Sequence, residues 1–76
     1  MMPVDVLSCG EWADVAEVSG EPSWITRLAE LGLRVGSRIR VLQQGTPCIL
    51  QVGDARLSLR GDAVLQVLVQ PIHAAL

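Results

Sequence analysis

The chain is short, half of it is hydrophobic and its charge is nearly balanced, with 76 residues, 50% hydrophobic content and a formal net charge of −2 at pH 7. A chain of this length forms a single domain and buries only about 60% of the surface that its unfolded form exposes. The near-neutral charge excludes a strongly basic nucleic-acid binder, and two cysteines are too few for the disulfide framework of a small secreted module. We therefore expect one domain over residues 1–76, with its core within residues 10–69.

The N-terminal part of the chain predicts two β segments. A short edge segment is expected within residues 1–9, and a first full strand is expected from Trp12 to Val18. The spacing of the apolar residues in that strand places Val15 and Val18 in the core. The domain thus begins with β-structure.

A short helix is expected after a cluster of turn-forming residues at 19–23. Apolar residues recur at helical spacing as far as Leu31, so Leu28 and Leu31 are expected to face the core and Arg27 to face solvent. Gly32 then ends the helix, because a residue without a side chain readily adopts the left-handed conformation that closes a last turn. The helix is therefore inserted between the first strand and the rest of the sheet.

The second half of the chain predicts strands separated by tight turns. These strands are expected at residues 38–43, 48–52, 55–60 and 64–69. The last of them is apolar on both faces, which is typical of a central strand. Five antiparallel strands with one short inserted α-helix indicate a mostly β fold, a small, partly open barrel, for which an SH3-like barrel is the first choice and an OB-type barrel the second.

Few residues of the chain could carry chemistry. The sequence has one histidine, no lysine and no tyrosine, and no Ser, His and Asp set at a spacing that suggests a nucleophile, so we expect no enzyme. Cys9, Cys48 and His73 are candidate ligands for iron or zinc, with a carboxylate such as that of Glu11 as a fourth, within one chain or between subunits. No spacing of these residues supports a metal site. Cys48 also fits the role of a small buried hydrophobic residue, and His73 fits that of a solvated residue near the terminus.

Four arginines of the predicted strands could share one face of the sheet: Arg38, Arg40, Arg56 and Arg60. No aromatic side chain is expected between them, as a base-stacking surface would require. A solvated face that discourages pairing of strand edges explains them better. We therefore expect no nucleic-acid partner.

The chain opens with neither a basic segment nor a long apolar run, so we expect no signal peptide, no direct membrane insertion and a cytoplasmic protein with reduced thiols. Acidic residues dominate 1–30 and basic residues dominate 31–76. This separation either steers a partner or is neutralised within the fold. The apolar excess likewise either is scattered over the surface or faces a partner.

Two segments of the sequence resemble the FeoA family, small proteins of bacterial ferrous iron transport. The first joins Arg27-Leu28, Leu31-Gly32-Leu33 and Gly36 to an alternating strand, and the second joins Leu57-Ser58-Leu59-Arg60 and Ala63 to a final Val/Leu strand. The chain departs from the family at Val35, where proline is usual, and at Gly45–Cys48, where a longer apolar loop ending in Gly-Asp-Pro is frequent. The resemblance extends over residues 10–69.

This resemblance implies an SH3-like barrel that acts as a cytosolic accessory to FeoB, the membrane iron permease with an attached GTP-binding domain, and is recruited by it to the inner membrane. The same kind of barrel is appended to iron-dependent transcriptional repressors. A domain that contacts a transcription factor is therefore one alternative, and a metal-binding or metal-bridged regulatory module is another. The oligomeric state, including a homo-oligomer, is left open.

Two surfaces are expected to contact the partner. The first is the helix and its exit, with Arg27, Leu28, Leu31 and Leu33. The second is the loop that ends at Cys48, with Gln44, Gly45, Thr46 and Pro47. Leu28 and Leu31 equally fit core packing, whereas Leu33 is expected to be exposed by the turn after the helix.

Overall fold

A computed structural model describes residues 1–72 of the chain and contains six strands, one α-helix and two 3-10 helices in that range. The strands are β1 (Met2–Pro3), β2 (Trp12–Val18), β3 (Arg38–Gln43), β4 (Cys48–Val52), β5 (Ala55–Leu59) and β6 (Val67–Pro71). The helices are α1 (Pro22–Glu30) and the 3-10 segments η1 (Val4–Val6) and η2 (Gly61–Gln66). Expected and observed bounds agree for β2, β3 and β4.

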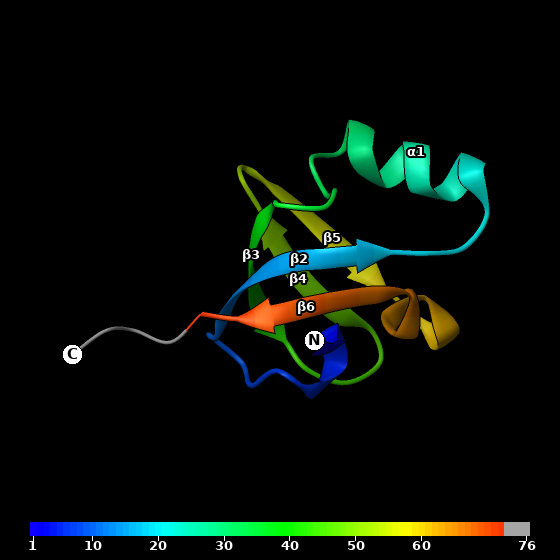
Figure 1. The fold of residues 1–76 in the computed structure, drawn as a ribbon. Coiled ribbons are helices and arrows are strands. Elements are labelled where there is room, and N and C mark those ends of the chain that lie inside the picture. The colour runs from blue at the N-terminus through cyan, green and yellow to red at the C-terminus, as the bar shows by residue number, and fades with distance from the viewer. Residues whose placement is uncertain (73–76) are drawn as a thin grey trace.

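The strands form one antiparallel sheet in the order β1-β6-β2-β3-β4-β5. Figure 1 shows β2 and β6 crossing in front of β3, β4 and β5, with α1 at one end of the molecule. Strand β6 is central, as its apolar faces predicted, and β1 and β5 are the edges. The mostly β architecture with one inserted helix is confirmed, with a sixth strand of two residues added at the N-terminal edge.

One hydrophobic core fills the space inside the curved sheet. Its buried members come from every strand except β1, from η1 and the residue after it, from α1 and from the turn that follows α1: Val4, Leu7, Ala13, Val15, Leu28, Leu33, Ile39, Val41, Cys48, Leu50, Val52, Leu57, Leu59, Val67 and Val69. No polar or charged side chain is buried within residues 1–72. Helix α1 contributes Leu28 to this core as a buried residue, and Trp24 packs against the core while half-buried.

The exit of α1 differs from the expectation at two leucines. Leu31 is 46% exposed and Leu33 is 1% exposed, so the expected positions of the two side chains were wrong. The helix ends at Glu30, and Gly32 turns the chain at a φ of 101°. The amide of Leu33 then donates to the carbonyl of Leu28 at 2.9 Å. This is the Schellman end of a helix, in which the second residue beyond the cap packs back on the last turn and is buried.

Strand β2 and the segment before β6 also differ from regular alternation. The pairing of β2 with β6 shifts between Val15 and Glu17, and this irregularity leaves Glu17 exposed and Val18 half-buried against the core. Residues 64–66, expected as strand, belong instead to the 3-10 segment η2. A run that is apolar on both faces carries no period, so its first half could not be assigned from the pattern.

No helix within residues 1–72 combines the length and the apolar character needed to cross a membrane.

Candidate functional site

A groove of about 390 Å³ lies between α1 and the edge strand β5. It is lined by side chains of the helix, the strand and the 3-10 segment that follows: Trp24, Arg27, Leu28, Leu31, Leu57, Ser58, Leu59, Arg60 and Ala63. The groove joins two segments that are about thirty positions apart in the sequence. These are also the two segments that carry the family resemblance.

The helical wall of the groove is one face of α1. Trp24, Leu28 and Leu31 follow each other at intervals of four and three residues, the spacing that places side chains in one row along a helix. Pro22 suits the first helical position because its fixed φ is already helical, and Gly32 ends the helix after Leu31. Leu28 forms the buried floor, whereas Trp24 is half-buried and Leu31 is exposed.

The opposite wall is the edge of β5 and the residue that follows it. Leu57 and Leu59 are buried and alternate with the exposed Ser58 and Arg60, the pattern of a strand with one face on a core. All four consecutive residues line the groove. The groove therefore runs along the strand edge itself rather than over one face of the sheet.

The charge of the groove is positive. Arg27 and Arg60 line it, and none of its lining residues is acidic. Within the part of the chain that the structure describes, one ion pair is present, between Arg38 Nε and Asp14 Oδ1 at 3.2 Å. The guanidinium groups of Arg27 and Arg60 thus remain free to meet an anionic partner.

The structure brings together part of the first expected contact surface. Arg27, Leu28 and Leu31 all line the groove, but Leu33 is buried and is corrected to a core residue. Trp24 and Arg60 were not expected as contact residues. Trp24 could have been found from its spacing to Leu28 and Leu31, whereas Arg60 joins them only because β5 lies beside the helix.

The second expected contact surface, the loop before Cys48, does not line the groove. Gln44, Gly45 and Thr46 are exposed and Pro47 is half-buried. The side-chain amide of Gln44 donates from Nε2 to the carbonyl of Leu7 at 2.7 Å, which ties the loop to the N-terminal segment. The two expected surfaces are therefore separate features of the fold.

The candidate metal ligands are in different environments. Cys9 is exposed, with its Sγ 3.2 Å from the carbonyl of Leu42. Cys48 is fully buried, and its burial, with a smaller contribution from the Asp5 carboxylate, raises the pKa of its thiol. His73 lies outside the described residues. Residues 1–72 contain no group of three or more His, Cys, Asp or Glu side chains that could hold a metal ion.

The expected iron or zinc site also has a carboxylate that is already engaged. Glu11 Oε1 accepts a hydrogen bond from the amide of Ser8 at 2.9 Å. This contact holds the turn before β2. The described residues therefore give the proposed ligand set no common position.

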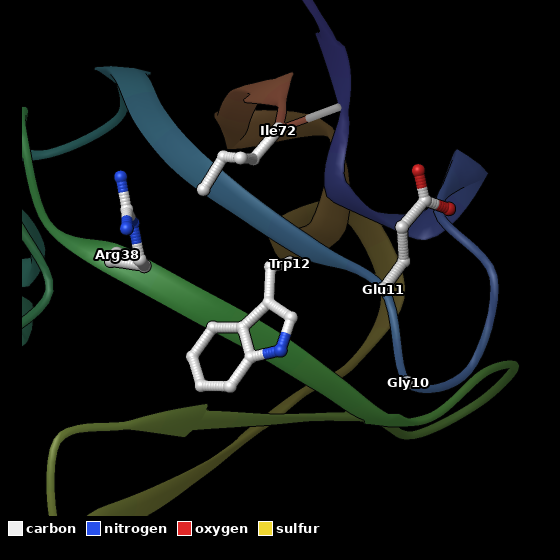
Figure 2. Close-up of a pocket in the computed structure, with 5 residues that line it drawn as sticks. All are labelled: Gly10, Glu11, Trp12, Arg38 and Ile72. Carbon is white, nitrogen blue, oxygen red and sulfur yellow. The ribbon is translucent and has the colours of Figure 1, made fainter. Parts of the chain in front are cut away.

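A second hollow, of about 480 Å³, lies at the start of β2 and is lined by Gly10, Glu11, Trp12, Arg38 and Ile72. Figure 2 shows the Trp12 ring lying over β3, with the Glu11 carboxylate turned away from it. Trp12 is paired with Arg40 across β2 and β3, and the Arg40 guanidinium lies 5.5 Å from the ring centroid. Trp12, on the strand next to β3, thus lies beside one of the four strand arginines but not between them.

The charged groups around this second hollow already have partners. Arg38 pairs with Asp14, Arg40 Nε donates to the carbonyl of Gly10 at 3.3 Å, and Glu11 accepts from Ser8. An arginine stacked on an aromatic ring gains cation–π energy in that position. The groove beside α1, with free arginines and an exposed leucine, is the better candidate for binding.

Comparison with known proteins agrees with the fold. The FeoA domain family model matches residues 2–71. A FeoA protein from Chlorobium tepidum superposes with a TM-score of 0.87 at 28% identity, covering 95% of this chain and 71% of that one. No curated protein matches the chain.

Two further solved structures extend the comparison. Stenotrophomonas maltophilia FeoA, solved with zinc and described as a prokaryotic SH3 domain protein with a suggested role in activating ferrous iron transport, has a TM-score of 0.77 and 30% identity over 92% of this chain and 91% of that one. A manganese-dependent transcriptional repressor has a TM-score of 0.80 at 22% identity, with 92% of this chain matched to 41% of that one. The second likeness shows the fold alone. The SH3-like architecture expected from the sequence is confirmed.

Proposed function

Because the chain belongs to the FeoA family, which is associated with ferrous iron transport, we propose that it is a cytosolic, non-catalytic accessory protein that docks on the cytosolic part of an FeoB-type permease. Docking would recruit it to the inner membrane. The observation that supports a binding role is the groove between α1 and β5. It combines an exposed leucine, a half-buried tryptophan and two free arginines.

These residue types fit a protein interface. Tryptophan and arginine are the residues that most often dominate the energy of protein contacts, and they act best in a pocket that excludes water. In the groove Trp24 offers apolar area, while Arg27 and Arg60 offer charge at the rim. The partner is therefore expected to present an apolar anchor flanked by acidic groups.

The repressor-type alternative is not favoured by an observation on this chain. It is supported by a likeness in fold at 22% identity, and the repressor is more than twice as long as the matched part. A gene for a repressor next to the gene for this chain, in place of a permease gene, would favour that alternative.

Docking is tested by adding the detergent-solubilised permease, and separately its GTP-binding domain, to the isotope-labelled chain while amide resonances are followed. We expect shifts or broadening at Trp24, Leu31 and Arg60. Replacing Leu31 with alanine should weaken the effect about tenfold, since a large part of an interface's energy comes from a few buried anchors.

Val35→Ala is the matched control, because Val35 is also an exposed aliphatic residue of the helix exit but does not line the groove. Its effect on binding should be less than about twofold. Contacts as weak as about −4 kcal/mol are detected at about millimolar concentration. If no resonance moves at that concentration with either the permease or its GTP-binding domain, docking is ruled out. Shifts confined to residues 44–47 would instead place the contact on the loop.

A further inference from the structure

The edge of β5 is an open strand edge. It is five residues long, contains no proline and pairs only with β4. The opposite edge of the sheet, β1, has two residues, and one of them is Pro3. Short length and proline are common means of blocking an edge, and β1 has both whereas β5 has neither.

The hairpin register shows which backbone groups of β5 are open. Val52 and Ala55 close a two-residue turn in which Gly53 has a φ of 58°, as a type II′ turn requires at its first central position. The closing pair of such a hairpin shares both hydrogen bonds, and bonded pairs alternate along an antiparallel ladder. The amides and carbonyls of Arg56 and Ser58 therefore point away from β4, and within residues 1–72 they bond to no other element.

Of the two residues with open groups, Ser58 lines the groove. Ser58 and its neighbours line one wall, and the row of Trp24, Leu28 and Leu31 on α1 lines the other. A strand added to β5 would thus have backbone partners on one side and an apolar helix face beside it. Extended peptides bind in this way when a sheet edge supplies hydrogen bonds and a nearby pocket receives alternate side chains.

The charges on the two walls select the partner. Arg56 and Ser58 lie on the outer side of β5 and Arg60 is exposed directly after the strand, whereas Leu57 and Leu59 lie on the inner side. An added strand has the same alternation, so its inner residues would meet apolar side chains and its outer residues would meet arginines.

On the basis of the proposed docking role, we propose that the partner contributes an extended segment of alternating apolar and acidic residues that adds to β5 as a further antiparallel or parallel strand. Its apolar side chains pack against Trp24 and Leu31, and its carboxylates pair with Arg56 and Arg60. Arg27 supplies a third positive group from the helical wall.

A second copy of this chain is a poorer occupant in the register that centres on Ser58. Antiparallel pairing of two β5 edges centred on Ser58 would place Arg56 of each copy opposite Arg60 of the other. Like charges directly opposite each other in a ladder destabilise the pairing. The arginines thus disfavour this self-pairing, whereas an acidic partner strand would meet them with opposite charge.

Synthetic peptides test strand addition without the permease. The probe is a blocked octapeptide in which glutamate and valine alternate, and its control replaces each glutamate with lysine. We expect the acidic peptide to bind with a Kd of about 1 mM or tighter, to slow hydrogen exchange at the amide of Arg56 or Ser58 at least about tenfold, and to shift the resonances of Trp24. The lysine peptide should do none of these.

Methylation of the peptide's backbone amides gives the sharper readout, because it changes the peptide and leaves this chain unaltered. In a strand, the amides of alternate residues point to opposite edges, so only the glutamate amides or only the valine amides can face β5. Of two peptides methylated on one set or on the other, one should lose binding and the other should keep it. Equal binding of the two methylated peptides, or equal binding of the acidic and lysine peptides, overturns strand addition.

The same exchange measurement on the permease complex separates this inference from the docking role. If the permease binds but the amides of Arg56 and Ser58 stay unprotected, docking stands and strand addition is overturned. If the acidic peptide binds with the expected protection but the permease does not, strand addition stands and the docking role fails.

Discussion

At the scale of single residues, Leu31 and Leu33 show what the apolar pattern did and did not predict. Helical spacing correctly predicted that Leu28 lies in the core. The same spacing, continued as far as Leu31, wrongly predicted that Leu31 is buried as well. The better signal was the pair formed by Leu28 and Leu33 around Gly32. In a Schellman end these are the two positions that make the hydrophobic contact. Gly32 was correctly expected to end the helix, but the burial of Leu33 that this kind of helix end brings was not predicted.

Truncating the two leucines should therefore have unequal effects. Leu33→Ala removes a side chain that is 1% exposed and should lower the free energy of unfolding by about 2–4 kcal/mol. Leu31→Ala removes a side chain that is 46% exposed and should cost less than about 1 kcal/mol. Urea unfolding followed by tryptophan fluorescence measures both. Equal losses for the two variants would contradict the observed helix exit.

At the scale of elements, sequence reasoning succeeded where a turn residue and a clear period coincide. Strands β3 and β4 are each bordered by glycine or proline and alternate along their length, and their expected bounds match the structure. The segment before β6 has neither property, and its first half is the 3-10 segment η2. The position of α1 beside β5 depends on tertiary packing, so the groove itself could not be predicted from local pattern.

The turn at Gly32 fixes the direction in which the chain leaves α1 and hence the position of the helix over the groove. Its φ of 101° is unfavourable for a residue with a side chain, while the nearest atom to an added Cβ, Val52 Cγ1 at 3.4 Å, is in ordinary contact. Gly32→Ala should therefore cost about 1–2 kcal/mol through backbone strain rather than through a clash. Gly32→Asn should cost less, because asparagine tolerates left-handed conformations better than alanine.

Thermal unfolding of the two Gly32 variants distinguishes backbone strain from a steric clash. In a domain of this size, a difference of 1 kcal/mol corresponds to a change in Tm of about 4–8 °C. A variant series in which asparagine is as destabilising as alanine would indicate that steric contact, not backbone conformation, requires glycine at this position.

At the scale of the whole molecule, the separation of acidic and basic residues along the chain is only partly neutralised by direct pairing. Asp14 and Arg38 join the two halves across β2 and β3, but their side chains are 44% and 62% exposed, so the pair contributes little to stability. The arginines of the groove have no acidic partner within residues 1–72. Of the two interpretations left open by the sequence, steering of an acidic partner fits the groove, and local neutralisation fits the region around Trp12.

Binding of the permease or its GTP-binding domain should consequently depend on salt through the groove arginines. Arg27→Gln and Arg60→Gln should each weaken binding about three- to tenfold at low ionic strength, mainly by slowing association. Arg34→Gln makes the same change in net charge at an exposed position outside the groove, and it should alter binding less than about twofold. Raising the salt from about 0.05 M to about 0.5 M should bring all three variants and the unaltered chain closer together, because the Debye length falls well below 10 Å. If Arg34→Gln were as harmful as the groove variants, the effect would follow net charge, and the groove would have no special part in recognition.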